Sequence, residues 1–346
     1  MKKAVILFNL GGPDKLENVE PFLFNLFNDP AILNVPSFLR YPLAKLISKK
    51  RVSVARKIYT EIGGASPILQ LTNKQAESLE KKLNNNSKQD IYKCFVVMRC
   101  WKPRAETVLN VVKEFDPEEM ILLPLYPQYS ASTSGSSIKE WNDICIKKNY
   151  QKPSKTICCY PTETEFLNAH VSLINNKLKN LDNFKLIFSA HGLPKRNINK
   201  GDPYQWQVEQ SVNKIIKQLS MANLDWVLCY QSRVGPLKWI GPSTDDEIIK
   251  SSKLNKTIVV VPIAFVSEHS ETLVELDIEY KKLAEQNGCK NFIRVPALGT
   301  THEFINSLAN LVFKSNLSEE RLNYYHPSKK CPDYFIKCPC SNKLKN

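Results

Sequence analysis

Residues 186–194 read LIFSAHGLP and residues 258–273 read IVVVPIAFVSEHSETL, and these two stretches decide the fold. Each begins with an apolar run, which is typical of a buried strand in a parallel sheet. Each then places a histidine after that run, His191 in the first stretch and His269 in the second. Because ligands of open α/β sheets bind beyond the carboxyl ends of the strands, both histidines are candidates for a functional site.

Strand-like runs alternate with helical patterns along the rest of the chain. This alternation predicts an α/β fold with two doubly wound halves, each built on a parallel four-stranded sheet with helices on both faces. The expected strands are 4–9, 93–98, 120–125 and 156–160, then 185–190, 226–230, 257–263 and 292–296. The expected helices between them include 71–84, 102–114, 163–179, 203–219 and 302–314.

The pattern divides the chain into three parts. Residues 1–180 are expected to form an N-terminal α/β half and residues 181–314 a C-terminal α/β half. Residues 315–346 are polar and rich in Lys, Asn, Pro and Cys, so we expect an extended, cysteine-rich tail.

The net charge of +14 allows attraction to anionic lipid, nucleic acid or an anionic small molecule. The basic residues are scattered and form no nucleic-acid motif, so we expect no nucleic-acid partner. No run approaches the roughly 20 apolar residues of a membrane span. The apolar run at 4–8 is too short for a signal peptide and lacks a cleavage site, so we expect a cytoplasmic protein.

Four glutamates lie within and just after the second histidine stretch, at spacings of three, four and four: Glu268, Glu271, Glu275 and Glu279. On a regular helix they would form one stripe, a conduit for a hydrated divalent cation. The alternative is an exposed acidic face near a helix N-terminus, which we prefer for Glu279. For Glu271, which is close to His269 and at a strand end, we prefer the functional interpretation. Small neighbours surround His191, and histidine is the natural proton acceptor near neutral pH.

Residues 126–137 read YPQYSASTSGSS and follow an expected strand at the entry to a helix. Tyr126 and Tyr129 offer two aromatic faces beside a row of hydroxyls, which suits a flat apolar ligand with polar edges. The alternative is a cluster of Ser and Thr that caps the helix.

Three cysteines stand within ten residues of the tail: Cys331, Cys338 and Cys340. Such dense thiols in a reducing compartment usually hold a metal. The fourth ligand must come from elsewhere, and Cys158 or Cys159, at the end of the fourth strand, is the candidate. Four thiolates suit either Zn²⁺ or a [2Fe–2S] cluster.

Taken together, these motifs resemble the ferrochelatase family over nearly the whole chain. The segments that carry the resemblance are 9–13 (NLGGP), 63–68 (GGASPI), 126–130 (YPQYS), 189–194 (SAHGLP), 201–204 (GDPY), 231–236 (QSRVGP), 239–242 (WIGP) and 262–280. The resemblance implies two Rossmann-like domains with a porphyrin cleft between them. It implies insertion of Fe²⁺ into protoporphyrin IX, the terminal step of haem synthesis.

The resemblance also implies roles for single residues. His191 and Glu271 would form the catalytic and metal-binding pair, with His269 and the acidic side chains of Glu275 and Glu279 as an inner path. The implied substrate-binding residues are Leu10, Tyr126, Tyr129, Thr133, Trp239 and His269. Leucine at position 10, where relatives acting on coproporphyrin often carry tyrosine, favours protoporphyrin.

For the tail, the resemblance favours the [2Fe–2S] cluster over zinc. The internal cysteine of the animal-type pattern would align near Ala169, which is not a cysteine. The fourth ligand is therefore expected to be Cys158 or Cys159, and we choose Cys158. A basic protein with a poorly soluble product is further expected to contact the cytoplasmic face of the inner membrane peripherally.

Three alternative functions stay open at this point. A coproporphyrin ferrochelatase and a cobalt chelatase share the expected fold, and a non-catalytic carrier of metal or tetrapyrrole would use the same ligands. A nucleotide-dependent transferase is disfavoured, because neither glycine-rich turn, 11–13 or 63–67, matches a phosphate-binding loop.

Overall fold

The computed structural model describes residues 1–233, 235–318, 321–323 and 331–340. The chain forms two compact units. The first unit comprises the described residues within Met1–Cys159 and Leu308–Tyr324, and the second unit those within Tyr160–Ser307 and Tyr325–Asn346. Each unit is built on its own parallel sheet, so the expected α/β class and the doubly wound architecture are confirmed.

The sheet of the first unit has the strand order β2-β1-β3-β4-β9. Every neighbouring pair in it is parallel. The two-residue strand β9 adds a short fifth member to the four strands expected. The bounds are β1 Lys2–Asn9, β2 Ile91–Met98, β3 Glu119–Pro124, β4 Ser154–Ile157 and β9 Leu322–Asn323.

The core of the first unit packs against β1, whose residues 4–8 are fully buried. The rings of Phe8 and Trp141 meet edge to face with centroids 6.1 Å apart. The helices of this unit are η1 Leu16–Asn18, α1 Val19–Phe27, α2 Ser37–Thr60, α3 Ile68–Asn86, α4 Ala105–Phe115 and α5 Ser134–Lys147. Helix α11, His302–Leu317, carries the chain back from the second unit to the first.

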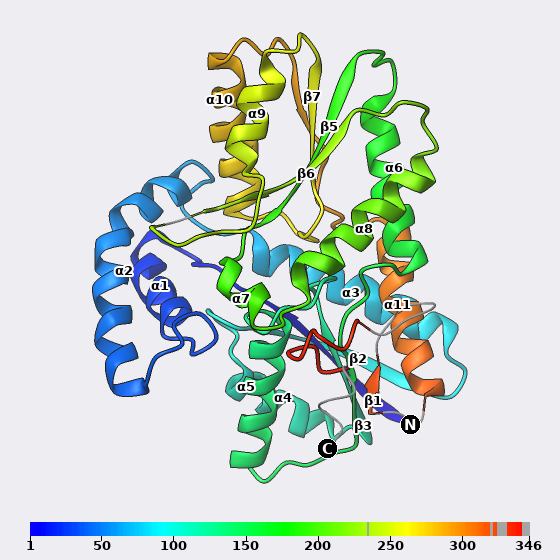
Figure 1. Ribbon diagram of the computed structural model, residues 1–346. Coiled ribbons are helices and arrows are strands. Elements are labelled where there is room, and N and C mark those ends of the chain that lie inside the picture. The colour runs from blue at the N-terminus through cyan, green and yellow to red at the C-terminus, as the bar shows by residue number, and fades with distance from the viewer. Residues whose placement is uncertain (234, 319–320, 324–330, 341–346) are drawn as a thin grey trace. The chain divides into compact units, whose positions relative to one another are not determined.

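The sheet of the second unit has the order β6-β5-β7-β8, again with parallel pairs throughout. Figure 1 shows α9 and α10 to one side of these strands and α6 to the other. The strands are β5 Phe184–His191, β6 Trp226–Gln231, β7 Thr257–Pro262 and β8 Phe292–Arg294. The helices are α6 Thr164–Leu178, α7 Lys195–Asn199, α8 Tyr204–Leu219, α9 Thr244–Ser252, the π-helix η2 Glu271–Tyr280 and α10 Lys281–Gln286.

In each sheet the first strand has its later neighbours on both sides, so the chain adds strands first on one side of it and then on the other. In the second unit, β5 has β6 on one side and β7 on the other, so the crevice between the ends of β5 and β7 is a topological switch point. In the first unit β1 lies in the same way between β2 and β3. Each unit therefore offers one preferred place for ligands, and the sequence motifs fall at these places.

The units divide earlier than the boundary expected near residue 180, because α6 packs against α8 and therefore belongs to the second unit. The described tail, 331–340, forms turns in the second unit instead of extending from it. The backbone N–H of Lys337 donates to the carbonyl oxygen of Gly201, and Phe335 is buried. Within the described part of the chain, no helix is both long and apolar enough to cross a bilayer.

Candidate active site

His191 and Glu271 meet at the switch point of the second unit. His191 is the last residue of β5, and Glu271 opens the π-helix that follows the neighbouring strand β7. The Nδ1 atom of His191 lies 2.8 Å from the Oε2 atom of Glu271, and both side chains keep partial exposure, 39% and 25%. The structure thus brings together the two residues that the sequence motifs single out.

Each partner shifts the pKa of the other. Burial lowers the pKa of His191, but the charge and the hydrogen bond of Glu271 outweigh it and raise the pKa above its usual value. Burial likewise opposes ionisation of Glu271, but the charge and hydrogen bond of His191 prevail and hold its pKa well below the usual range. Between the pKa of Glu271 and the pKa of His191 the pair is therefore a carboxylate and an imidazolium, and the imidazole becomes neutral as the pH rises above the pKa of His191.

A second carboxylate, Glu275, lies behind Glu271, and Ser232 connects the two. The Ser232 hydroxyl is 2.6 Å from Glu275 Oε2 and 3.1 Å from Glu271 Oε2, and the Ser232 backbone N–H donates to Glu275 Oε1. Ser232 has a φ of +59°, a conformation that costs free energy in a residue other than glycine. That conformation turns both donors of Ser232 toward the carboxylates.

Two further contacts complete the surroundings of Glu275. The Gln231 side-chain amide donates to Glu275 Oε2 over 3.0 Å, and the Tyr280 hydroxyl lies 3.1 Å from Glu275 Oε1. Burial and the nearby charge of Glu271 raise the pKa of Glu275. Sequence reasoning did not assign a role to Ser232 or Tyr280. The signals available for Ser232 were its place two residues after a predicted strand and within the segment 231–236 that carries the family resemblance.

The expected stripe of four glutamates is wrong, because the segment Glu271–Tyr280 is a π-helix and not an α-helix. Its hydrogen bonds join residues five apart, so its side chains do not follow the regular α-helical stripe that was expected. Glu279 is exposed. Glu268 precedes the helix and pairs with Arg294, whose guanidinium also binds Asp277. The carboxylates behind His191 are therefore Glu271 and Glu275.

His269 is buried beside this group and points its Nδ1 atom at the carbonyl oxygen of Ser267, 3.2 Å away. Burial lowers the pKa of His269, so its ring is neutral near pH 7. The centroid of the Phe265 ring lies 4.7 Å from that of the His269 ring. A neutral ring packed in this way has a fixed orientation. Because it carries no charge, it does not repel a cation.

Trp239 lies against the backbone next to His191. A Cβ atom added at Gly192 would come within 3.3 Å of the Trp239 ring and within 2.8 Å of the carbonyl oxygen of Gln231. Residues 193 and 194 also pair with 239 and 240 through backbone contacts. The missing side chain of Gly192 therefore lets the Trp239 ring approach the end of β5.

The remaining predicted substrate residues belong to the first unit, at its own switch point. Leu10 follows β1 and is half-buried, and Tyr126 follows the adjacent parallel strand β3. Tyr129 is buried, with its hydroxyl where a side chain at Gly135 would have to lie. Thr133 stands at the N-terminus of α5 but makes no side-chain capping bond, so the capping interpretation does not hold for it.

The tail cysteines gather within the second unit. Cys331 accepts a hydrogen bond from the Gln207 side chain over 3.1 Å. A hydrogen bond between Cys331 and Cys338, together with burial, raises the pKa of Cys331. The sulfur atoms of Cys338 and Cys340 lie within 4.8 Å of each other, and all three thiols are buried. Cys158, in the first unit, is fully buried just after β4.

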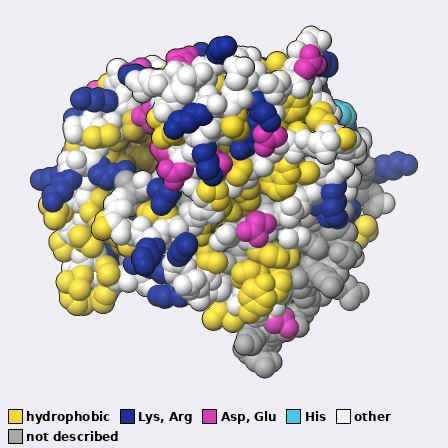
Figure 2. Space-filling model, turned by 45° about the horizontal axis from the view of Figure 1, so that its top comes forward, with side chains coloured by type: hydrophobic (Ala, Val, Ile, Leu, Met, Phe, Trp, Pro, Cys, Tyr) yellow, Lys and Arg dark blue, Asp and Glu magenta, His cyan; other side chains and the backbone are white. Residues whose placement is uncertain are grey.

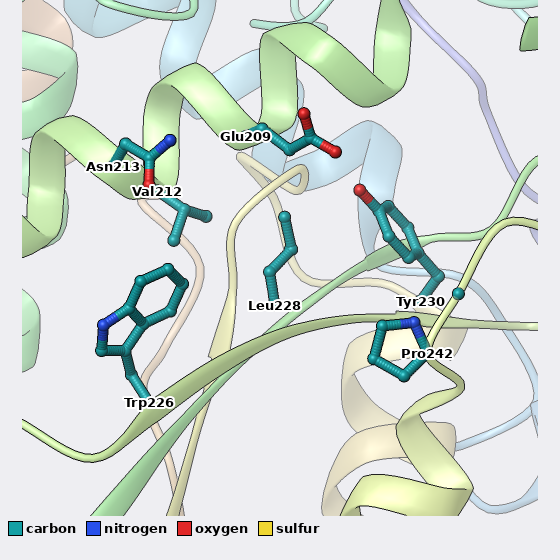
Figure 3. A pocket seen from close by; sticks show the side chains of 8 residues that line it. Glu209, Val212, Asn213, Trp226, Leu228, Tyr230 and Pro242 are labelled. Carbon is teal, nitrogen blue, oxygen red and sulfur yellow. The ribbon is translucent and has the colours of Figure 1, made fainter.

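A separate pocket of about 240 Å³ lies between α8 and β6 in the second unit. Figure 3 shows side chains of alternate β6 residues facing those of the helix. Its lining residues are Glu209, Val212, Asn213, Trp226, Leu228, Tyr230, Gly241 and Pro242. Neither His191 nor Glu271 lines it, so the chemistry of that pair does not take place there.

Comparison with known proteins adds to this geometry. A family model described as Ferrochelatase matches residues 2–316. The chain is 67% identical over 342 residues to a protein named Ferrochelatase from Pelagibacter ubique, covering 99% of each. It is 50% identical to a protein of that name from Rickettsia prowazekii, covering 98% of each. Among solved structures, SirB from Bacillus subtilis with Fe³⁺ matches with a TM-score of 0.53, covering 91% of this chain and 96% of that one. Its sequence identity of 12% limits that likeness to the fold.

Proposed function

This chain belongs to the ferrochelatase family, and we propose that the His191–Glu271 pair is the site at which the family's reaction takes place. The protein is a lyase that inserts ferrous iron into protoporphyrin to make haem. The observation that carries the site assignment is the 2.8 Å contact between an imidazole and a carboxylate at a switch point. Fe²⁺ is a substrate in this reaction.

The alternatives are not favoured. A coproporphyrin ferrochelatase, a cobalt chelatase and a non-catalytic carrier were all compatible with the motifs alone. Full-length relatives at 67% and 50% identity carry the name Ferrochelatase, while the sirohydrochlorin chelatase SirB from Bacillus subtilis matches at 13%.

The chemistry required of the site is proton removal and metal placement. Free-base porphyrin carries two N–H protons, and each turnover exchanges them for one Fe²⁺ ion, with no redox step. His191 in its neutral form has a lone pair that accepts a pyrrole proton or binds the metal, and both roles need the deprotonated ring. The Glu271 carboxylate supplies a negatively charged oxygen ligand for the incoming cation.

The ring-binding residues follow from the same proposal. Apolar and aromatic side chains stabilise a bound porphyrin mainly through burial and stacking. Trp239, whose ring lies against Gly192, places an aromatic side chain close to the residue that follows His191. The proposed substrate-binding set is Leu10, Tyr126, Tyr129, Thr133, Trp239 and His269.

For the tail we propose a [2Fe–2S] cluster held by Cys331, Cys338, Cys340 and Cys158. The fit is supported by three buried thiols that lie together within the second unit, in a chain whose cysteines are all free of disulfides. A bound cluster would stabilise the polar tail. Zinc is the competing occupant of the same thiolates.

We further propose a cytoplasmic location with peripheral contact to the inner membrane. Helix α2 supports the membrane contact, because it exposes apolar and basic side chains together. Phe38 is 74% exposed, and the basic side chains of Lys45, Lys49, Lys50 and Arg51 are exposed as well. Figure 2 shows hydrophobic side chains beside Lys and Arg on the left, the side on which α2 lies in Figure 1. Such a surface binds anionic lipid headgroups.

The experiment that tests the site is an anaerobic insertion assay. Purified protein, Fe²⁺ and protoporphyrin are mixed without oxygen, and the absorbance change of metalloporphyrin formation is followed. His191→Ala and Glu271→Gln are compared with the unaltered protein. Turnover near the unaltered rate in either variant would remove that residue from the site.

A further inference from the structure

The hydroxyl of Tyr280 lies between two carboxylates. It is 3.1 Å from Oε1 of Glu275 and 3.3 Å from Oδ2 of Asp245, at the start of α9. The ring itself is only 4% exposed and packs in the core with Ile187 and Leu276. A phenol at this depth needs polar partners for its hydroxyl, and these carboxylates supply them. Tyr280 therefore connects the buried side of the metal-binding group to an exposed residue, Asp245.

The π-helix determines which residue reaches Glu275. One π-turn joins positions five apart, so position 280 stacks on position 275. On an α-helix, Glu279 would take that place, four residues on. In this protein Glu279 is exposed instead. The side chain that fixes Glu275 is thus a neutral hydroxyl and not a third carboxylate.

Glu275 in turn fixes the donors that orient Glu271. It accepts hydrogen bonds from the side-chain amide of Gln231 and from both the backbone and the hydroxyl of Ser232. The same Ser232 hydroxyl lies 3.1 Å from the oxygen of Glu271 that contacts His191. A displaced Glu275 would release the backbone and the hydroxyl of Ser232, and the contact between that hydroxyl and Glu271 would no longer be fixed in place.

We propose that Tyr280 is a positioning residue for the metal-binding carboxylate Glu271, acting through Glu275 and Ser232, and that Asp245 holds Tyr280 from α9. This inference rests on the proposed role of His191 and Glu271. Groups that orient a metal ligand typically change metal affinity or activity by 10–100-fold when they are removed. The ring-binding residues do not belong to this hydrogen-bonded series, so the affinity for porphyrin is not expected to change when Tyr280 loses its hydroxyl.

The test is Tyr280→Phe, which keeps the ring and removes only the hydroxyl. Initial insertion rates are measured against Fe²⁺ at saturating protoporphyrin, and against protoporphyrin at saturating Fe²⁺. We expect the KM for Fe²⁺ to rise about tenfold, while the KM for protoporphyrin stays unchanged. The comparison variant is Glu285→Gln, at an exposed position on α10, which should leave both KM values unchanged.

Three results would overturn the inference: an unchanged KM for Fe²⁺ in Tyr280→Phe, an equal rise in both KM values, or the same rise in Glu285→Gln. Asp245→Asn changes an exposed residue and tests the series even if Tyr280→Phe does not fold. It should raise the KM for Fe²⁺ in the same direction, and no change would contradict the role of Asp245. Loss of turnover in His191→Ala and Glu271→Gln alongside an unaffected Tyr280→Phe would leave the proposed site intact and reject only this inference.

Discussion

The Nδ1 atom of His191 and the Oε2 atom of Glu271 lie 2.8 Å apart although 80 residues separate them in the chain. The contact exists because β5 and β7 are adjacent parallel strands whose carboxyl ends reach the same edge of the sheet. It joins a base and an acid, so the ionisation of each depends on the other.

The first prediction concerns the titration of His191. With Glu271 beside it, the histidine should titrate above 6.5, the value from which its pKa is raised. In Glu271→Gln only burial remains as the dominant influence, so the pKa should fall. The stabilisation from a raised histidine pKa is present below the unfolded pKa and is lost as the pH rises through the folded pKa. NMR titration of the ring proton signals measures both values, and His170, buried on α6, serves as an internal reference. An unchanged pKa in Glu271→Gln would contradict the coupling.

The second prediction separates catalysis from ring binding. His191→Ala and Glu271→Gln should each nearly abolish turnover but retain most of the porphyrin affinity, because affinity comes mainly from apolar burial. The lost interactions are those specific to the reaction. Fluorescence quenching by protoporphyrin measures affinity, and circular dichroism verifies the fold. Parallel loss of affinity and turnover would indicate instead that the pair binds the ring.

The third prediction concerns Gly192. An added methyl group would meet the Gln231 carbonyl oxygen at 2.8 Å and the Trp239 ring at 3.3 Å, so the backbone must move. Overpacking of this kind costs about 1–3 kcal/mol, measured by urea unfolding of Gly192→Ala. The matched control is Gly241→Ala, where the added Cβ would find its nearest contact at 3.8 Å. Equal free energies of unfolding in the two variants would show that Trp239 and the neighbouring backbone can shift at little cost.

The fourth prediction concerns the membrane surface. Flotation with vesicles that contain anionic lipid should recover the protein at low salt and release it as the salt concentration rises, because charge attraction is screened. Replacing Phe38 and Leu39 of α2 by serine should weaken recovery further. Ile146 on α5 is also exposed, and Ile146→Ser should have no effect. Retention at high salt would point to a mainly apolar contact.

The fifth prediction concerns the tail. Anaerobically purified protein should be reddish and contain about two irons and two sulfides per chain, as the cluster type requires. Cys340→Ser should lose the colour and some stability, whereas Cys94→Ser, in a half-buried strand position, should keep both. Colourless protein with stoichiometric zinc would replace the cluster by a zinc site. Colourless, metal-free protein with reactive thiols would mean that neither occupant is present.

The strands that carry the site could be predicted because both faces of β5 and β7 are buried. Such strands are continuous apolar runs, and the sequence shows their ends plainly. His191, His269 and Glu271 were found for that reason: His191 stands at the end of the first run, and His269 and Glu271 lie in the segment that follows the second. Helix α2 was not predicted, because its exposed apolar side chains obscure the periodicity on which helix prediction depends.

The inner part of the site could not be predicted for a different reason. The role of Ser232 arises from a backbone conformation with positive φ, which its residue type does not indicate. The role of Tyr280 arises because the backbone hydrogen bonds of a π-helix join residues five apart, whereas the prediction from sequence assumed the spacing of an α-helix. The cluster ligand set and the porphyrin residues stay predictions.

The ten-residue π-helix also determines which mutations the site can accept. Which side chains meet along this helix depends on how many residues each turn contains. The number of residues in the segment therefore matters as much as the chemistry of its side chains. A one-residue deletion between Glu275 and Tyr280 would turn every later side chain by about 100° if the segment relaxed to an α-helix. Homologues of this protein should therefore vary in residue type along this helix far more readily than they gain or lose a residue within it.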